Sequence, residues 1–247
     1  MISNLFSTFI YQPIYNALVF LVGVVPGGDV GIAIIILTIL IKLILFPLSK
    51  KAIQTQIVMR EIDPELKQLR EDFKDNKEEL ARKTMALFKD KKINPFASIF
   101  LILIQLPIIF GLYFVFFNEG KDGGFDGSLL YNFISIPEVF SFSFMGIIEL
   151  TGKSIVLALI VAITQYYIAR LMSPKAPETK GTSLKDDFQR SMHLQMRYVF
   201  PVIIGLVAYF ISAAVALYLA VSNLFALGQE IMVKRMRDRS IEKPEAL

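Results

Sequence analysis

A lysine inside an otherwise apolar segment is the residue of this chain best placed to act chemically within a membrane. Lys42 lies in the run 31–48, and no other side chain of that run is charged. A lysine within a spanning helix costs about 2.5–3.5 kcal/mol on insertion scales, and such residues usually face a bundle interior or a water-filled cavity. Lys50 marks the end of the segment about 12 Å further along a helix. The pattern predicts a charge in a polar cavity, with snorkelling to the interface as the competing interpretation.

Further polar side chains interrupt the apolar stretches and are candidates for the same cavity: Thr38, Gln105, Gln165, Ser222 and Asn223. Thr38 precedes Lys42 by one helical turn and can share its face, although a hydroxyl bonded to its own helix backbone is an equal alternative. For Gln105 and Gln165 the competing interpretation is an ordinary hydrogen bond between helices. Ser222 and Asn223 are expected to bond a neighbouring helix.

Several classes of site are excluded by composition. The chain has no Cys, so disulfides and thiolate metal sites are excluded, and its one His, His193, rules out a multi-histidine metal site. The sequence contains no phosphate-binding glycine loop and no nucleophile with a plausible histidine base. We therefore expect no catalytic residue, no metal and no cofactor, and a function other than that of an enzyme.

The apolar content predicts a polytopic α-helical membrane protein. Hydrophobic residues make up 54% of the 247 residues, and the mean hydropathy is +0.55. Predicted spans cover 31–48, 95–117 and 152–172. The last apolar stretch, 198–233, would be about 54 Å long as one helix, far more than a bilayer needs. Basic residues flank both of its ends, so it must cross an even number of times. We predict two legs, 198–212 and 213–233, with a turn near Ser212-Ala213-Ala214.

The segment 1–30 is predicted to be an interfacial helix followed by a turn. Polar residues recur every four positions and form a stripe on a helix: Asn4, Thr8, Gln12 and Asn16. Such a stripe, with Pro13 inside the helix, favours a helix lying in the interface over a span. Pro26-Gly27-Gly28-Asp29 ends the helix.

Basic residues divide the remaining segments by side of the membrane. The segment 49–94 holds 12 of the 26 Lys and Arg and is predicted to be a cytoplasmic hairpin of two amphipathic helices. Asn76 with Glu79 resembles a capping box at its turn. Only Lys42, Lys121 and Lys153 lie outside the inferred cytoplasmic segments or their span ends. The loop 118–151 is therefore predicted to be extracytoplasmic, and the loop 173–197 and the tail 234–247 are predicted to lie in the cytoplasm.

The order of these elements resembles the YidC/Oxa/Alb family of membrane protein insertases, over about residues 5–235. Five motifs in the family's order carry the resemblance: Ile34 to Lys42 followed by Phe46-Pro47-Leu48, Lys91-Lys92-Ile93-Asn94-Pro95, Ile104-Gln105-Leu106-Pro107-Ile108, Met172-Ser173-Pro174, and Leu217 to Asn223. Two departures stand out. Lys42 occupies the position of a groove arginine, keeping the charge but losing the planar fork. Ser212-Ala213-Ala214 replaces the Pro-x-Gly turn that is often seen in the family.

The resemblance implies a five-helix fold around a hydrophilic groove that opens to the cytoplasm and the lipid. It implies an insertase and chaperone in a bacterial cell (inner) membrane, with a cytoplasmic C-terminus. Nascent membrane proteins and the lipid bilayer are the implied partners, a ribosome and a Sec-type translocon stay open, and no nucleic-acid specificity is expected. Two alternatives stay open too. One is a small anion transporter or channel that uses Lys42 as its binding site, and the other is a structural subunit of a membrane complex.

Overall fold

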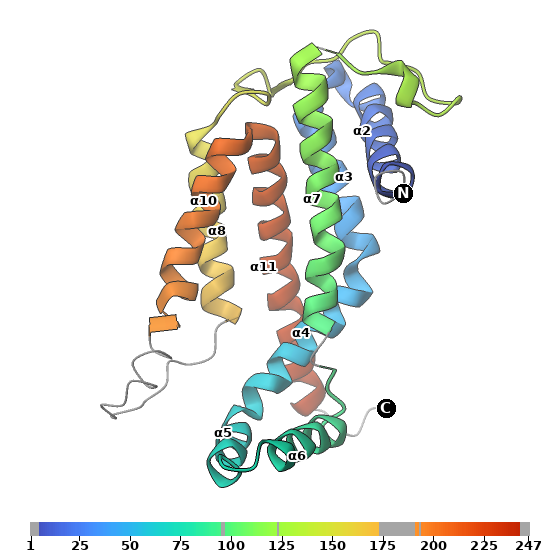
Figure 1. Ribbon diagram of the computed structural model, residues 1–247. Helices are drawn as coiled ribbons and strands as arrows, with labels where there is room; N and C mark the ends of the chain where they lie inside the picture. The colour runs from blue at the N-terminus through green and yellow to red at the C-terminus, as the bar shows by residue number, and fades with distance from the viewer. Residues whose placement is uncertain (1–4, 95–96, 123, 173–190, 193, 243–247) are drawn as a thin grey trace. The chain divides into compact units, whose positions relative to one another are not determined.

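A computed structural model describes residues 5–94, 97–122, 124–172, 191–192 and 194–242, and most of these are helical (Figure 1). In the described residues the elements are η1 Ser7–Tyr11, α2 Gln12–Val24, η2 Pro26–Gly28, α3 Val30–Ile44, α4 Phe46–Glu61, α5 Asp63–Asp72, α6 Lys77–Asp90, α7 Ala97–Asp122, η3 Gly127–Leu129, β1 Ser143–Phe144, β2 Ile148–Glu149, α8 Ile155–Met172, η4 Gln195–Val199, α10 Phe200–Ile211 and α11 Ala213–Glu242. The chain divides into two compact units, residues 1–44 with 105–228 and residues 45–104 with 229–247.

The predicted class, an all-α membrane protein, is confirmed. Within the described residues, Ser7–Val24 and Ala213–Arg239 are each long and apolar enough to cross a membrane. The pair α3 and α4 provides a third candidate if it is counted as one broken span. Shorter apolar helices cover Leu103–Phe116, Ile155–Leu171 and Gln195–Ile211. The finer prediction of five spans stays a prediction.

The core of the first unit is built from the apolar faces of several helices. Leu18 and Val22 of α2 and Ile34 of α3 are fully buried, as the 3.6-residue period of an amphipathic helix requires. Helix α8 packs along α10, and Gly205 makes the approach close (Figure 1). A Cβ atom at Gly205 would lie 2.7 Å from the Cβ atom of Ala162. Small residues at this crossing are typical of helix packing in membranes.

Two residues of the polar stripe in the first helix, Gln12 and Asn16, bond to the backbone of a distant loop. Asn16 is buried, and its Nδ2 donates to the carbonyl of Leu129 at 2.9 Å. Its Oδ1 accepts from the backbone N–H of Tyr131 at 2.7 Å. Gln12 donates to Leu129 as well, at 3.2 Å. Gln12 and Asn16 therefore bind the backbone of the loop after α7, whereas Thr8 is exposed and Asn4 lies outside the described residues. An interfacial position of this helix stays a prediction, and its length and composition also suit a span.

The loop after α7 is fastened to the start of α3 by Asp29. Its Oδ1 accepts from the N–H of Ile32 at 2.9 Å, which caps α3, and its Oδ2 accepts from the N–H of Met145 at 2.7 Å. Gly28 lies against the same loop with a φ of 62°, and a Cβ there would lie 2.1 Å from the carbonyl oxygen of Val139. The loop also contains a small antiparallel β1–β2 hairpin that pairs Phe144 with Ile148.

Two helices predicted to be continuous are broken next to a proline. The helix expected over 31–48 ends at Ile44, and α4 begins at Phe46. Pro47 follows at the second position of α4, where it has no N–H for the carbonyl of the preceding turn. The first arm of the hairpin breaks in the same way at Ile62, before Pro64 of α5. The hairpin 49–94 thus contains three helices rather than the expected two.

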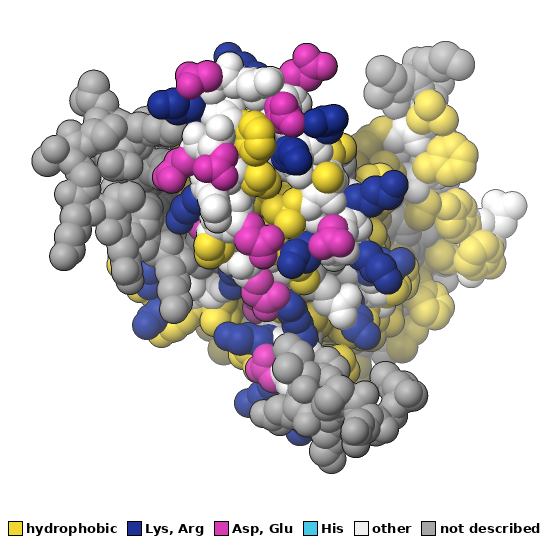
Figure 2. Space-filling model, turned by 90° about the horizontal axis from the view of Figure 1, so that it is seen from below, with side chains coloured by type: hydrophobic (Ala, Val, Ile, Leu, Met, Phe, Trp, Pro, Cys, Tyr) yellow, Lys and Arg dark blue, Asp and Glu magenta, His cyan; other side chains and the backbone are white. Residues whose placement is uncertain are grey.

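The turn of the hairpin is as predicted. The side chain of Asn76 accepts from the N–H of Glu79 at 3.0 Å and caps α6. A small core lies within the hairpin, where Ile62, Leu66 and Ile93 are buried. Figure 2 shows basic and acidic side chains interspersed on the face seen from below, around a strip of hydrophobic ones.

The predicted turn in the last apolar stretch is confirmed. Ser212 is extended, between the end of α10 and the start of α11. Ala213 and Ala214 are fully buried and donate to the carbonyls of Gly152 and Leu150, at 2.8 and 3.0 Å. Helix α11 runs on to Glu242, well beyond the predicted end at 233. Most of the predicted cytoplasmic loop 173–197, with His193, lies outside the described residues.

Candidate functional site

Lys42 belongs to a line of polar side chains that joins three helices of the first unit. Its Nζ donates to Oε1 of Gln105 at 3.5 Å, from α3 to α7. The Nε2 of Gln105 donates to the hydroxyl of Tyr218 on α11. Ser222 lies one turn after Tyr218 and beside the same hydroxyl. These four polar side chains therefore converge, although they lie up to 180 positions apart in the sequence.

Lys42 has no charged partner among the described residues. Its side chain is half-buried, and among the described residues no carboxylate lies within ion-pair distance of it. Its hydrogen-bond partner, Gln105, is an uncharged amide. A half-buried cation with a neutral partner can still attract an incoming carboxylate, because its charge is screened less than on an open surface.

The hydroxyl of Thr38 bonds to the backbone of its own helix, which is the structural alternative to a role in the cavity. Its hydroxyl donates to the carbonyl of Ile34 at 2.6 Å, one turn back on α3, and the side chain is buried. Such a bond satisfies the hydroxyl within its own helix. The bond therefore gives Thr38 a structural role in α3. A role of Thr38 in the substrate groove stays a prediction.

Asn223 makes the bond between helices that the sequence led us to expect. Its Nδ2 donates to Oγ1 of Thr164 at 3.1 Å, from α11 to α8. Thr164 donates in turn to the carbonyl of Ile160 at 2.7 Å. Gln165 is half-buried on α8 next to Thr164. A role for Gln165 or Asn223 with a substrate stays a prediction.

Sequence reasoning did not single out Tyr218 or Thr164. A signal for Tyr218 was available, because its hydroxyl lies four residues before Ser222 on a helical face and Tyr is amphipathic. Thr164 gave a weaker signal, since one hydroxyl in an apolar helix usually bonds its own backbone.

The family of the chain follows from its sequence over nearly this whole architecture. Residues 21–240 match the family model described as 60Kd inner membrane protein. The chain belongs to this family. The match to the 60Kd inner membrane protein family includes Lys42, Gln105 and Tyr218 as well as the charged hairpin 49–94.

Relatives of this chain share one name. The chain is 31% identical over 221 residues to "Membrane protein insertase YidC" of Clostridium tetani, covering 90% of this chain and 89% of that protein. It is 30% identical over 230 residues to the protein of the same name from Fusobacterium nucleatum, covering 92% and 98%. A longer relative from Tolumonas auensis is 28% identical over 231 residues, which make up 37% of its length. The expected insertase family is thus confirmed.

Proposed function

We propose that this protein inserts and helps to fold integral membrane proteins, with Lys42 as the positive charge of its substrate groove. The observation that carries the proposal is the half-buried ammonium of Lys42, held by the neutral Gln105 in a bundle of apolar helices. Family membership supports insertion, which is the activity in the names of the relatives. Those names denote a role without bond chemistry, and an anion channel is not favoured.

The proposed mechanism is physical. A short polar segment of a substrate enters a hydrated groove, where water and the polar line from Lys42 to Tyr218 lower the cost of leaving bulk solvent. The apolar segment of the substrate slides along the outer face of the helices into lipid, driven by hydrophobic partitioning. Lys42 attracts substrate carboxylates as they enter, and Gln105 keeps the ammonium in place. The membrane potential adds to transfer of charged segments.

The proposed topology places the charged hairpin 49–94 and the C-terminus in the cytoplasm of a bacterium, with the spans in its inner membrane. The support is the distribution of Lys and Arg, which leaves 118–151 with one basic residue, Lys121. The hairpin is then available to nascent chains. A ribosome and a Sec-type translocon are further candidate partners, supported by the resemblance alone.

Reconstitution tests insertion directly. The full chain is placed in lipid vesicles, a small single-span protein is synthesised outside them, and its protection from protease is measured. Efflux of a trapped anion is followed in the same vesicles. We expect protection of the substrate and no added anion flux. Anion flux without insertion would contradict the proposal and favour a channel.

A further inference from the structure

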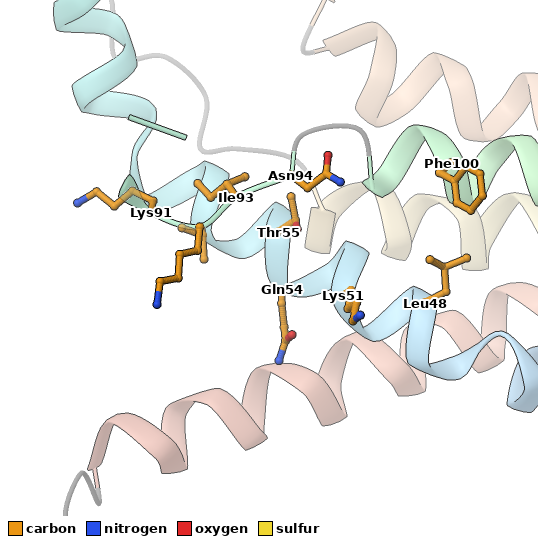
Figure 3. A pocket seen from close by; sticks show the side chains of 10 residues that line it. Leu48, Lys51, Gln54, Thr55, Lys91, Ile93, Asn94 and Phe100 are labelled. Carbon is orange, nitrogen blue, oxygen red and sulfur yellow. The ribbon is translucent and has the colours of Figure 1, made fainter. Parts of the chain in front are cut away.

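A cleft in the second unit lies beside the end of the charged hairpin. Its volume is about 480 Å³, within the usual range for a small-molecule site. Figure 3 shows Leu48 and Lys51 on α4, Ile93 on the segment after α6, and Phe100 on α7 around this cleft. The groove proposed for substrates contains none of these residues, so a ligand in this cleft is a separate proposal.

The lining combines cations with apolar surface. Lys51, Lys91 and Lys92 line the cleft, and none of the described lining residues is acidic. Lys91 is paired with Glu65 at 3.5 Å. Across the described residues, no carboxylate lies within ion-pair distance of Lys51 or Lys92. Two unpaired lysines beside apolar side chains suit an amphiphilic anion.

The backbone of Lys92 is a second and independent sign of a site. Helix α6 ends in a motif in which Lys92 donates to the carbonyl of Lys89 at 3.1 Å and Ile93 donates to that of Phe88 at 2.8 Å. Lys92 has a φ of 52° there, in the left-handed region where glycine is the usual residue. A lysine at this position is strained, and strain of this kind gathers at functional sites. Because this position holds lysine and not glycine, it places an ammonium group at the cleft.

We infer that this cleft binds the phosphate headgroup of an anionic phospholipid from the cytoplasmic leaflet. Lys51 and Lys92 hold the phosphate, and Leu48 and Phe100 contact the glycerol and the first methylenes of the acyl chains. The inference rests on the proposed topology, in which Leu48 ends one span and Phe100 lies near the start of the next. Basic pockets at the cytoplasmic ends of spanning helices are typical sites for anionic lipid headgroups. A free phosphate or an acidic peptide would leave the apolar wall without a partner.

A single reporter inside the cleft tests the inference. The chain has no Trp, so Phe100→Trp places the only indole in the lining. The full chain carrying this reporter is reconstituted in phosphatidylcholine vesicles. Quenching by added phosphatidylglycerol with brominated chains is compared with quenching by brominated phosphatidylcholine. We expect a preference of about 25-fold for phosphatidylglycerol, from about fivefold for each of the two lysines.

Three variants identify the groups responsible. Lys51→Gln with Lys92→Gln abolishes the preference, whereas the matched pair Lys83→Gln with Lys89→Gln, exposed on α6 outside the lining, keeps it. Lys92→Gly lowers the preference about fivefold and raises the Tm, because it relieves the left-handed backbone. An unchanged preference in the Lys51–Lys92 double variant would overturn the inference.

Competition identifies the kind of anion. Inorganic phosphate at tenfold excess is expected to leave the quenching by phosphatidylglycerol unchanged, as is hexaglutamate. Full displacement by phosphate would assign the cleft to a free anion, and displacement by hexaglutamate to an acidic protein segment, and either result overturns the inference. The measurement involves no inserted substrate, so its failure is distinguishable from a failure of the insertase proposal.

Discussion

The Nζ atom of Lys42 on α3 lies 3.5 Å from Oε1 of Gln105 on α7, and Gln105 donates in turn to Tyr218 on α11. A charge that is expensive in an apolar helix is therefore held by an amide that leaves it uncompensated. This relationship is the basis for predictions about charge, coupling and substrate preference.

A carboxylate at position 105 should silence Lys42. In Gln105→Glu the new acid replaces the amide oxygen that lies 3.5 Å from Nζ, forms an ion pair with the ammonium, and competes with substrate carboxylates. We expect insertion of a substrate with an acidic outer segment to fall about tenfold. Gln105→Met is the matched control, because it removes the hydrogen bond without adding charge, and it should fall only about twofold. Equal losses in the two variants would argue against competition for the charge.

Gln105 and Tyr218 should be energetically coupled. Gln105→Leu and Tyr218→Phe each break the bond between the two side chains, so the double variant should cost less than the sum of the single ones. We expect a coupling of about 0.6 kcal/mol, the average that double-mutant cycles give for hydrogen bonds between membrane helices. The measurement is reversible unfolding in mixed micelles. Strict additivity would show that the bond contributes nothing to stability.

Asp29 should hold the loop after α7 in place. Asp29→Ala removes the acceptor of two backbone N–H groups, those of Ile32 and Met145. We expect a loss of about 2 kcal/mol and a fall in Tm of about 5 °C in detergent. Glu138→Gln is the control, since Glu138 is an exposed acid of the same loop. If the two variants melt together, the two bonds of Asp29 do not stabilise the fold.

The packing of α8 on α10 should be intolerant of a single methyl group at Gly205. A Cβ there meets that of Ala162 at 2.7 Å, so Gly205→Ala should destabilise the protein by about 1–3 kcal/mol. Gly228 in α11 has nothing within 4 Å of such a Cβ. Gly228→Ala should therefore stabilise the protein by up to about 1 kcal/mol, from helix propensity alone. Thermal unfolding of the two variants should shift in opposite directions.

Local sequence rules predicted the features that depend on a few neighbouring residues. Asn76 caps α6, as its spacing to Glu79 indicates. The chain turns at Ser212, inside the long apolar stretch whose two basic flanks predicted a turn. The single polar residue in each of several apolar stretches also pointed to Lys42 and Gln105. These signals lie in residue type and spacing, so they need no knowledge of the tertiary structure.

Partners distant in sequence could not be predicted in the same way. The stripe through Asn16 looked like a surface for headgroups because its partner, the backbone at Leu129 and Tyr131, is more than 100 residues away. The spacing of Tyr218 and Ser222 was a local signal, but only the fold brings Gln105 to the hydroxyl of Tyr218. Pro47 was visible in the sequence, but whether it kinks a helix or ends it depends on packing around it.

The most direct test of the central claim is insertion by Lys42 variants in vesicles. Two single-span substrates that differ only in an acidic or a neutral outer segment are compared by protease protection. We predict that Lys42→Arg inserts both substrates normally, because the charge is kept, and that Lys42→Ala inserts the acidic one about tenfold less efficiently and the neutral one nearly normally. Normal insertion of both substrates by Lys42→Ala would contradict the role of Lys42 as the charge of the groove.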